Sequence, residues 1–204
     1  TLEKNNAVYE KLEENDIIEK TAVAISNGKA IGWFQGRMEF GPRSLGCRSI
    51  LADPRLDNMQ KNLNLKVKFR ESFRPFAPSI LKSHLEEWFN INVESPYMLL
   101  IGNVNEKYLI QNNKKLYGFD KLNTKRSQIP AVTHVDNSAR IQTVNSETNY
   151  KYYKLIKKFY EITSCPILVN TSFNIRGEPI VYSVQDAFNC FMGTKLDILV
   201  VENY

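Results

Sequence analysis

Cysteine and histidine are scarce in this 204-residue chain, which holds three cysteines and two histidines. Cys47, Cys165 and Cys190 are far apart and form no CxxC pair, which argues against a disulfide framework or a zinc site. His84 and His134 have no second histidine or cysteine at ligand spacing, which argues against a protein-built transition-metal centre. We therefore expect no metal ligand from the protein and a reducing, cytoplasmic location.

Long hydrophobic runs are also absent. The longest, Met98 to Ile101 and Ile198 to Val201, are far shorter than the roughly 18 to 20 residues that cross a bilayer. No basic start leads into an apolar stretch, so nothing resembles a secretion signal. The chain begins with Thr1 rather than Met, and we expect it to be a piece of a longer protein.

The composition is that of a folded globular protein, with 43% hydrophobic and 24% charged residues. The length suits one domain. Apolar periodicity predicts helices over residues 16–26, 57–64, 83–89, 150–162 and 183–191, and strands over 29–35, 76–81, 97–104, 140–144, 166–170 and 197–201. Residues 105–128 are polar and are expected to form a surface excursion. Alternating strands and helices without repeats predict an α/β domain built on a mixed sheet.

Positive charge is concentrated in one segment. The net charge is +5, and residues 37–82 carry ten basic residues against four acidic ones, a net of +6, while the remainder sums to −1. Such a field favours a polyanion, either a nucleic acid or the phosphates of a small nucleotide. The alternative is a solvated basic face. The arginines here alternate with Gly, Pro and Phe, which weakens that alternative.

A glycine-punctuated stretch, residues 36–49, contains three of these arginines. Guanidinium groups bind phosphate bidentately, and tight turns free backbone amides as further donors. In the alternative, the arginines only pair with Glu39 and Asp53. Two carboxylates are too few for three guanidinium groups, so we favour a binding loop.

A basic stretch follows at residues 66–76. If it is extended, Lys68 and Arg70 point to one face and Phe69 packs on the other, so that two cations address one anion. Phe73 and Phe76 are expected in the core. Phenylalanines that flank a basic strip are also typical of single-stranded nucleic acid binders, and spacing alone does not separate the two readings.

Two further polar stretches carry candidate ligand contacts. Residues 170–179 follow a buried strand with short hydroxyl and amide side chains that can bond phosphate or ribose oxygens, although a plain Asx or ST turn has the same composition. Residues 130–136 offer a His134–Asp136 pair, followed by Arg140. A lone histidine is more often structural, so this pair is a weak signal.

Together and in this order, the blocks WFQGRMEFGPRSLGCRSILADPR, KVKFRESFRPFAPS, IPAVTHVDNSARIQTV and PILVNTSFNIRGEPIV resemble the C-terminal domain of the O-carbamoyltransferase family. That family includes nodulation-factor carbamoyltransferases and those that tailor tobramycin and cephamycin. The resemblance runs from about Ala22 to Val201. It implies a YrdC-like fold, with residues 22–204 as that domain and residues 1–21 as a lead-in from a missing N-terminal domain.

The resemblance also implies a reaction. ATP and carbamoyl phosphate are converted with Mg²⁺ to carbamoyl-adenylate and pyrophosphate. An N-terminal domain of ASKHA type, which holds an iron-type metal, then passes the carbamoyl group to a hydroxyl of a sugar or secondary metabolite. Mg²⁺ is expected to be held mainly by phosphates and water, so no protein ligand is named.

Residue roles follow from the family's KxR and SxN motifs, which are Lys68-Phe69-Arg70 and Ser172-Phe173-Asn174 here. The resemblance places one group at the triphosphate and carbamoyl oxygens, namely Lys68, Arg70, Arg74 and Arg43. It places a second group at the nucleotide, namely Ser172, Asn174, Asn170, Arg140 and Arg176. Ser44 and Cys47 stand where the family more often has Ala and Asn, which puts one loop contact in doubt.

Two other functions remain open from the sequence. One is an RNA-binding YrdC-like module that uses the basic strip, and the other is an inactive domain that serves only as an interaction partner. A nucleotide pocket requires Ser172, Asn174 and Arg140 to converge with the basic strip, whereas an extended RNA groove does not. A homodimer is left open.

Overall fold

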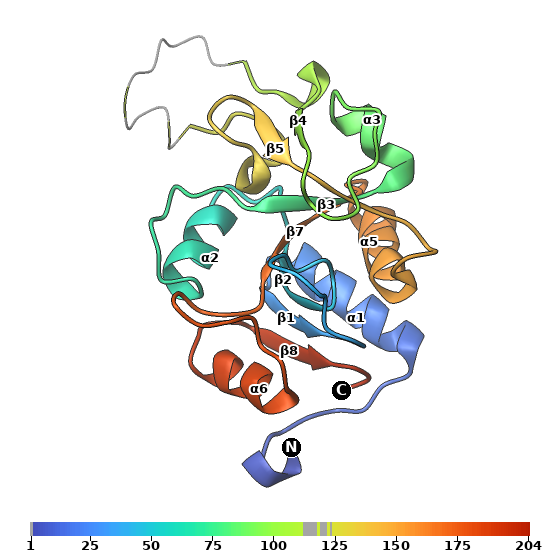
Figure 1. Cartoon of the computed structure of the whole chain (residues 1–204), viewed down its shortest axis with the longest axis vertical. Coiled ribbons are helices and arrows are strands. Elements are labelled where there is room, and N and C mark those ends of the chain that lie inside the picture. Colours follow the sequence, from blue (N-terminus) through green and yellow to red (C-terminus); the bar gives the residue numbers. More distant parts are fainter. Residues whose placement is uncertain (1, 112–117, 119–121, 123) are drawn as a thin grey trace.

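The computed structural model describes residues 2–111, 118, 122 and 124–204, which form two β-sheets with helices packed around them (Figure 1). The strands are β1 Ile31–Phe34, β2 Arg48–Ala52, β3 Ala77–Leu81, β4 Ile101–Asn103, β5 Ser138–Arg140, β6 Gln142–Val144, β7 Ile167–Ser172 and β8 Ile198–Val201. The α-helices are α1 Glu14–Ser26, α2 Met59–Lys66, α3 Leu85–Trp88, α5 Tyr150–Thr163 and α6 Val184–Met192. Short 3₁₀ helices lie at η1 Glu3–Asn5, η2 Lys82–His84, η3 Glu106–Tyr108 and η4 Pro130–Val132.

The larger sheet has six strands in the order β6-β3-β7-β2-β1-β8. The outer pairs β1–β8 and β3–β6 are parallel, and the three inner pairs are antiparallel. The smaller sheet is the antiparallel pair β4–β5, which lies with α3 at the end of the molecule away from β8 (Figure 1). The predicted mixed α/β architecture is confirmed.

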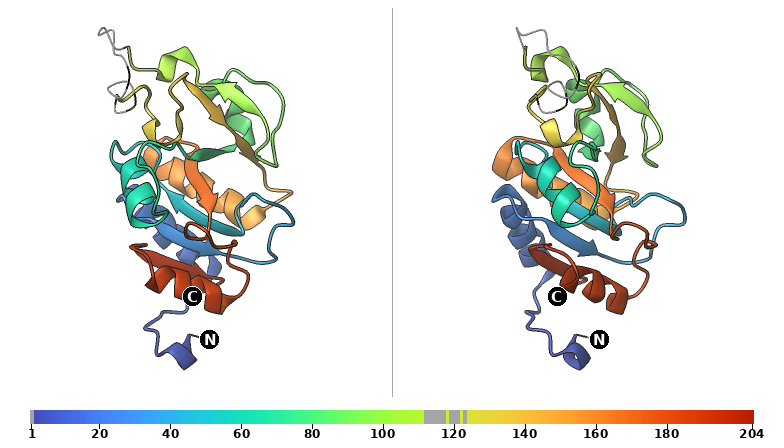
Figure 2. Two further views of the ribbon diagram at one scale, coloured as in Figure 1. Left: turned by 60° about the vertical axis from the view of Figure 1, so that its left-hand side comes forward. Right: turned by 90° about the vertical axis from the view of Figure 1, so that its left-hand side faces the viewer.

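The hydrophobic core lies on both faces of the large sheet. Every residue of β1, β2 and β3 is buried, as expected for strands covered on both sides. Helices α1 and α5 pack side by side on one face (Figure 2), while α6 packs against β1 and β8. Asn149 caps α5 by accepting from the Tyr152 amide, and α6 begins with the predicted capping box of Ser183 and Asp186. None of the described helices is long and apolar enough to cross a membrane.

The expected elements are present with three differences. Strand β2 was not predicted, and its first two residues, Arg48 and Ser49, fall within the glycine-punctuated stretch of residues 36–49. Residues 97–104 contribute only the three-residue β4, and residues 140–144 belong to two strands that meet at Ile141. The expected excursion at 105–128 lies partly outside the described residues. Residue 22, where the YrdC-like domain was expected to begin, falls inside α1.

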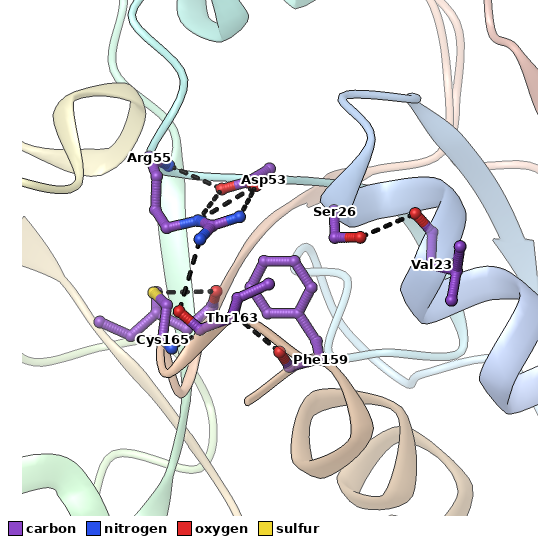
Figure 3. A network of polar contacts seen from close by, with 8 residues as sticks. Val23, Ser26, Asp53, Arg55, Phe159, Thr163 and Cys165 are labelled. Atoms are coloured by element: carbon purple, nitrogen blue, oxygen red, sulfur yellow. Dashed lines mark hydrogen bonds and ion pairs between the residues drawn. The ribbon is translucent and has the colours of Figure 1, made fainter. Parts of the chain in front are cut away.

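A buried ion pair fastens the end of β2 to the end of α5 (Figure 3). The Asp53 carboxylate is fully buried and accepts from Arg55 Nε at 2.9 Å and Nη2 at 2.6 Å. Arg55 Nη1 also donates to the Thr163 carbonyl at 3.4 Å, and the guanidinium lies 5.4 Å from the Phe159 ring centre. This network lies at the C-terminal end of β2, whereas Arg48 is the first residue of the strand.

Replacing Arg55 with alanine is expected to lower the free energy of unfolding by about 3 kcal/mol, because it leaves the buried Asp53 carboxylate without its cation. Urea unfolding of the two proteins measures this difference. Lys29→Ala is the control, since Lys29 is half exposed in its ion pair with Asp197 and its loss should change stability by less than about 1 kcal/mol. Equal stability of wild type and Arg55→Ala would contradict a structural role for the pair.

Candidate functional site

A pocket of about 160 Å³ lies where β7 ends and β2 and β3 begin. Its walls come from the glycine-rich loop, the segment after α2, β7 and the end of β5, segments far apart in the sequence. Five of the nine predicted site residues line it, namely Arg43, Arg70, Arg140, Asn170 and Ser172. The sheet order brings these residues together, because β7 pairs with β2 on one side and with β3 on the other. The convergence required of a small-ligand pocket is therefore present.

Lys68 joins the KxR and SxN motifs directly. Its Nζ donates to Ser172 O at 2.5 Å, Ser172 Oγ at 3.1 Å, Asn174 O at 3.0 Å and Asn174 Oδ1 at 2.7 Å. Ser172 Oγ in turn donates to Asn174 Oδ1 at 2.6 Å. Lys68 is 5% exposed, so its side chain is buried and takes part in packing. It holds the turn after β7 in place.

No carboxylate pairs with Lys68 in the described part of the chain. Burial lowers the pKa of its ammonium from the usual 10.5 to about 7, and the charge of Arg70 acts in the same direction. The four oxygen acceptors compensate the buried charge only in part, because none of them is an anion. An anion bound beside Lys68 would complete its coordination.

This lowered pKa sets how Lys68 contributes to stability as pH changes. Between about pH 7 and 10.5 the unfolded chain holds a Lys68 proton that the folded chain has largely released, so stability rises with pH through that window. Relative to Lys68→Met, which does not titrate, the wild-type free energy of unfolding should rise by at most about 1.4 kcal/mol per pH unit. Urea unfolding of both chains across this range tests it. A difference that does not change with pH would contradict the burial of a titrating amine.

The KxR segment is not extended, which corrects our expectation. Lys68 follows the C-terminal turn of α2, where its amide donates to the Leu63 carbonyl at 2.9 Å. Phe69 has a φ of 48°, in the left-handed region that non-glycine residues rarely adopt. Phe69 is 48% exposed and Phe73 is 45% exposed, so neither packs in the core as predicted, whereas Phe76 is buried as predicted. The backbone reversal at Phe69 sends Lys68 to the turn after β7 and leaves Arg70 on the pocket.

Asn64 in α2 positions Arg70, and sequence reasoning missed it. Asn64 is fully buried, and its Oδ1 accepts from Arg70 Nε at 2.6 Å. Its Nδ2 donates to the carbonyls of Ser72 at 3.2 Å and Arg74 at 2.7 Å. Arg70 also lies over the Phe76 ring at 4.9 Å. One amide thus shapes the loop after the KxR motif and aims its arginine.

Arg43 and Arg140 lie close enough for their positive charges to interact, and no described carboxylate pairs with either of them. Neither forms an ion pair with any described residue, and burial together with Arg43 lowers the pKa of Arg140. The Nη2 of Arg140 lies 4.0 Å from the Met98 sulfur, and its Nε is buried without a hydrogen-bond partner. Like charges gathered without acids favour an anionic ligand.

The glycine-rich loop is held by its own acid and by one of its arginines. Glu39 Oε1 accepts from the amides of Leu45 and Cys47 at 2.7 Å, and of Arg48 at 3.3 Å. The buried Arg48 guanidinium donates to the carbonyls of Gln35 and Cys47. The Glu39 carboxylate therefore bonds to backbone amides, and the Asp53 carboxylate pairs with Arg55. Neither carboxylate neutralises the charge of Arg43.

Cys47, one of the two departures from the family pattern, lies at the edge of this loop. Its sulfur accepts from Asn149 Nδ2 at 3.6 Å, and burial raises the pKa of its thiol to about 11. The thiol is therefore protonated near neutral pH and contributes no charge to the pocket.

A buried amide network fixes the floor of the pocket. Gln142 in β6, which the sequence reasoning did not single out, donates from Nε2 to the Leu45 carbonyl at 2.8 Å. Its Oε1 accepts from Ser79 Oγ at 2.6 Å and from Asn170 Nδ2 at 2.8 Å. Asn170 Nδ2 also donates to the Ser44 carbonyl at 3.1 Å. Ser44 and Leu45, the two residues that follow Arg43, are thereby anchored to β3, β6 and β7.

Three predicted cations, Lys68, Arg74 and Arg176, do not line this pocket, and neither does Asn174. Arg74 is exposed and pairs with Glu71 at 2.9 Å, and Arg176 lies exposed beyond the SxN turn. The suspected His134–Asp136 pair forms no side-chain bond, because the Asp136 carboxylate accepts from the amide and hydroxyl of Ser138. Burial lowers the pKa of His134. This stretch contributes Arg140 to the site and nothing further among the described contacts.

The chain is similar to proteins of known family. Residues 22–204 match the family described as Carbamoyltransferase C-terminus. The chain is 54% identical over 201 residues to the uncharacterized protein sll1178 of Synechocystis sp., which covers 97% of this chain and 33% of that protein. It is 45% identical to nodulation protein NolO of Bradyrhizobium diazoefficiens, over 92% of this chain and 32% of the relative. It is 36% identical to the 3'-hydroxymethylcephem-O-carbamoyltransferase of Amycolatopsis lactamdurans, over 80% of this chain and 28% of the relative.

Solved structures show the same fold at low identity. P. abyssi Sua5 complexed with L-threonine aligns over 95% of this chain and 48% of its own, with a TM-score of 0.61 and 16% identity. Full-length HypF in the phosphate- and nucleotide-bound form aligns over 91% of this chain and 21% of its own, with a TM-score of 0.56 and 14% identity. The expected YrdC-like fold is confirmed. The chain spans about a third of the length of the curated relatives it matches.

Proposed function

This chain belongs to the Carbamoyltransferase C-terminus family, and from that premise we propose that it activates carbamoyl phosphate with ATP to form carbamoyl-adenylate. The observation that carries the proposal is the convergence of Arg43, Arg70 and Arg140 with the Ser172 turn in one pocket that has no lining carboxylate. A triphosphate and an acyl phosphate bring several negative charges into such a pocket. The structural relative HypF has been solved with phosphate and nucleotide, which supports the same use of the fold.

The proposed chemistry balances with water as the only further reactant. A water oxygen bonds to the carbamoyl carbon as the bond between that carbon and the bridging oxygen breaks, which yields carbamate and inorganic phosphate. One proton of the water leaves on the phosphate and the other passes to solvent. A carbamate oxygen then attacks the α-phosphorus of ATP, and the bond to the pyrophosphate oxygen breaks. Fixed cations stabilise the charge that develops on the leaving pyrophosphate and need no reorganisation during the reaction. Carbamate is already an anion, so this step requires no general base.

Lys68, Ser172 and Asn174 position the ligand in this proposal. Lys68 fixes the turn after β7, so that the Ser172 hydroxyl and the adjoining amides keep one arrangement as phosphate enters. Arg43, Arg70 and Arg140 contact the phosphates. Arg74 and Arg176 remain candidates for the part of the triphosphate or nucleotide that extends beyond the pocket.

Mg²⁺ would enter the site bound to the phosphates of ATP and not to protein carboxylates. Within residues 2–111 and 124–204 no three His, Cys, Asp or Glu side chains gather as a metal site, and the pocket lining contains no carboxylate. Mg²⁺ commonly keeps phosphate and water ligands, so the ATP phosphates would carry it and it would neutralise part of their charge.

The acceptor step belongs to the longer protein. We place transfer of the carbamoyl group to a hydroxyl in the remaining two-thirds of such proteins, together with the ASKHA-type domain and its iron-type metal. The acceptor, a sugar or secondary metabolite, is selected there.

The experiment is exchange of labelled pyrophosphate into ATP by this chain, with and without carbamoyl phosphate. Exchange that depends on carbamoyl phosphate supports the proposal, because only an adenylate intermediate returns pyrophosphate to ATP. RNA binding measured at the same salt tests the alternative module. RNA binding without exchange and without ATP binding would overturn the proposal in favour of that alternative, and binding of neither would overturn both.

A further inference from the structure

Asn170 presents a buried hydrogen-bond acceptor that no described group uses. The residue lines the pocket and is 1% exposed, and its Oδ1 has no hydrogen-bond partner. An unsatisfied buried polar atom costs about 1–3 kcal/mol. Because Asn170 lines the pocket, a donor on a bound ligand would relieve this cost.

The orientation of the Asn170 amide is fixed by its neighbours. The Leu45 carbonyl can only accept, so the amide nitrogen of Gln142 must face it and Gln142 Oε1 must face Asn170. The Asn170 nitrogen then satisfies two acceptors, Gln142 Oε1 and the Ser44 carbonyl. A flipped amide would set oxygen against both of these, so the free atom of Asn170 is its oxygen.

The surroundings of this oxygen restrict the ligand. Arg43, Arg70 and Arg140 line the same pocket and call for an anion, whereas Asn170 Oδ1 calls for an N–H or O–H donor. A ligand that satisfies both carries a donor within a few atoms of a phosphate. Carbamoyl phosphate has this pattern, because its NH₂ group is separated from the phosphate by one carbonyl carbon and one oxygen.

We propose that Asn170 Oδ1 accepts a hydrogen bond from the carbamoyl NH₂ and so makes the pocket select carbamoyl phosphate over acyl phosphates without an N–H group. This rests on the proposed function and names the substrate atom that Asn170 contacts. An aspartate at this position could not replace asparagine, since it would repel phosphate and offer no donor to the Ser44 carbonyl and Gln142. The Gln142 and Ser79 side chains act as positioning residues for Asn170.

The test compares carbamoyl phosphate with acetyl phosphate, in which a methyl group replaces NH₂. The affinity of the chain for each is measured by calorimetry, for wild type and for Asn170→Ala. We expect wild type to prefer carbamoyl phosphate by about 10- to 100-fold, and Asn170→Ala to bind the two within about twofold of each other. Arg37→Ala is the control, because Arg37 is exposed in the glycine-rich loop and does not line the pocket, so it should keep the preference.

The outcomes separate this inference from the proposed function. Wild type that binds both acyl phosphates equally well would overturn the role of Asn170 while leaving adenylation possible, and this result needs no variant to fold. A preference for carbamoyl phosphate that persists in Asn170→Ala would overturn it too. If Asn170→Ala weakens ATP binding and leaves the preference unchanged, Asn170 contacts the nucleotide instead. Failure of wild type to bind either acyl phosphate or ATP would overturn both.

Discussion

Replacing Lys68 with methionine is expected to reduce carbamoyl-phosphate-dependent pyrophosphate exchange by about 100-fold or more. Methionine keeps the apolar length of the side chain but removes the charge and all four donated contacts to Ser172 and Asn174. The turn after β7 then loses the group that holds it, and the Ser172 hydroxyl at the pocket wall loses its fixed position. Exchange rates at saturating ATP, together with the KM for ATP, measure both effects.

Stability should respond much less than activity to this change. Loss of the hydrogen bonds destabilises the fold, whereas removal of a buried ammonium without a carboxylate partner stabilises it, so the two effects oppose each other. Lys66→Ala is the control, since Lys66 is exposed two residues earlier, at the end of α2, and its loss should leave exchange within about twofold. Exchange that survives in Lys68→Met would show that the KxR lysine is not needed for activation. Unfolding of Lys68→Met would assign Lys68 to the fold alone.

Replacing Arg140 with alanine is expected to weaken ATP binding by about 10- to 100-fold, the range for loss of a hydrogen bond between charged groups. Stability should stay constant or rise slightly, because Arg140 lies near the charge of Arg43 and makes no ion pair with a described residue. Affinity lost without stability lost is the signature of a cation that serves a ligand. Calorimetric titration with ATP and Mg²⁺, and urea unfolding, give the two quantities.

The matched control is Arg37→Ala. Arg37 belongs to the same glycine-rich loop and is exposed, but it does not line the pocket. Its removal lowers the net charge by the same amount as Arg140→Ala. If both substitutions weaken ATP binding equally, the effect comes from the overall field of the protein, and the pocket at the end of β7 is not the phosphate site.

Much of the architecture could be predicted because its signals are local. The apolar period of α1 and α5 and the capping box at Ser183 and Asp186 each lie within a few neighbouring residues. Strand β2 lacks such a signal, since it begins with Arg48, whose guanidinium is buried against backbone carbonyls. A charged residue in a fully buried strand cannot be recognised from hydrophobic pattern alone.

The sequence predicted the charged residues of the candidate site but not the neutral side chains that position them. Arg43, Arg70 and Arg140 have side chains that suggest phosphate by their chemistry, and the structure brings them into one pocket. Asn64 and Gln142 are neutral amides inside regular elements, and their roles depend on which carbonyls the tertiary fold sets beside them. The extended conformation expected for the KxR motif failed because the left-handed backbone at Phe69 has no sequence signal of the kind that glycine or asparagine provides.

The position of β7 between β2 and β3 has a consequence for how the protein is made. Its pairings join Leu51 with Asn170 and Ala77 with Asn170, so the pocket floor forms only when the chain has closed loops of more than ninety residues. Contacts between residues this distant form slowly and late in folding. During synthesis from the N-terminus, the cationic segments emerge before the strand that completes their pocket. A ligand of this pocket therefore cannot guide the early steps of folding, and a chain interrupted before Ile167 would have Arg43, Arg70 and Arg140 without the pocket.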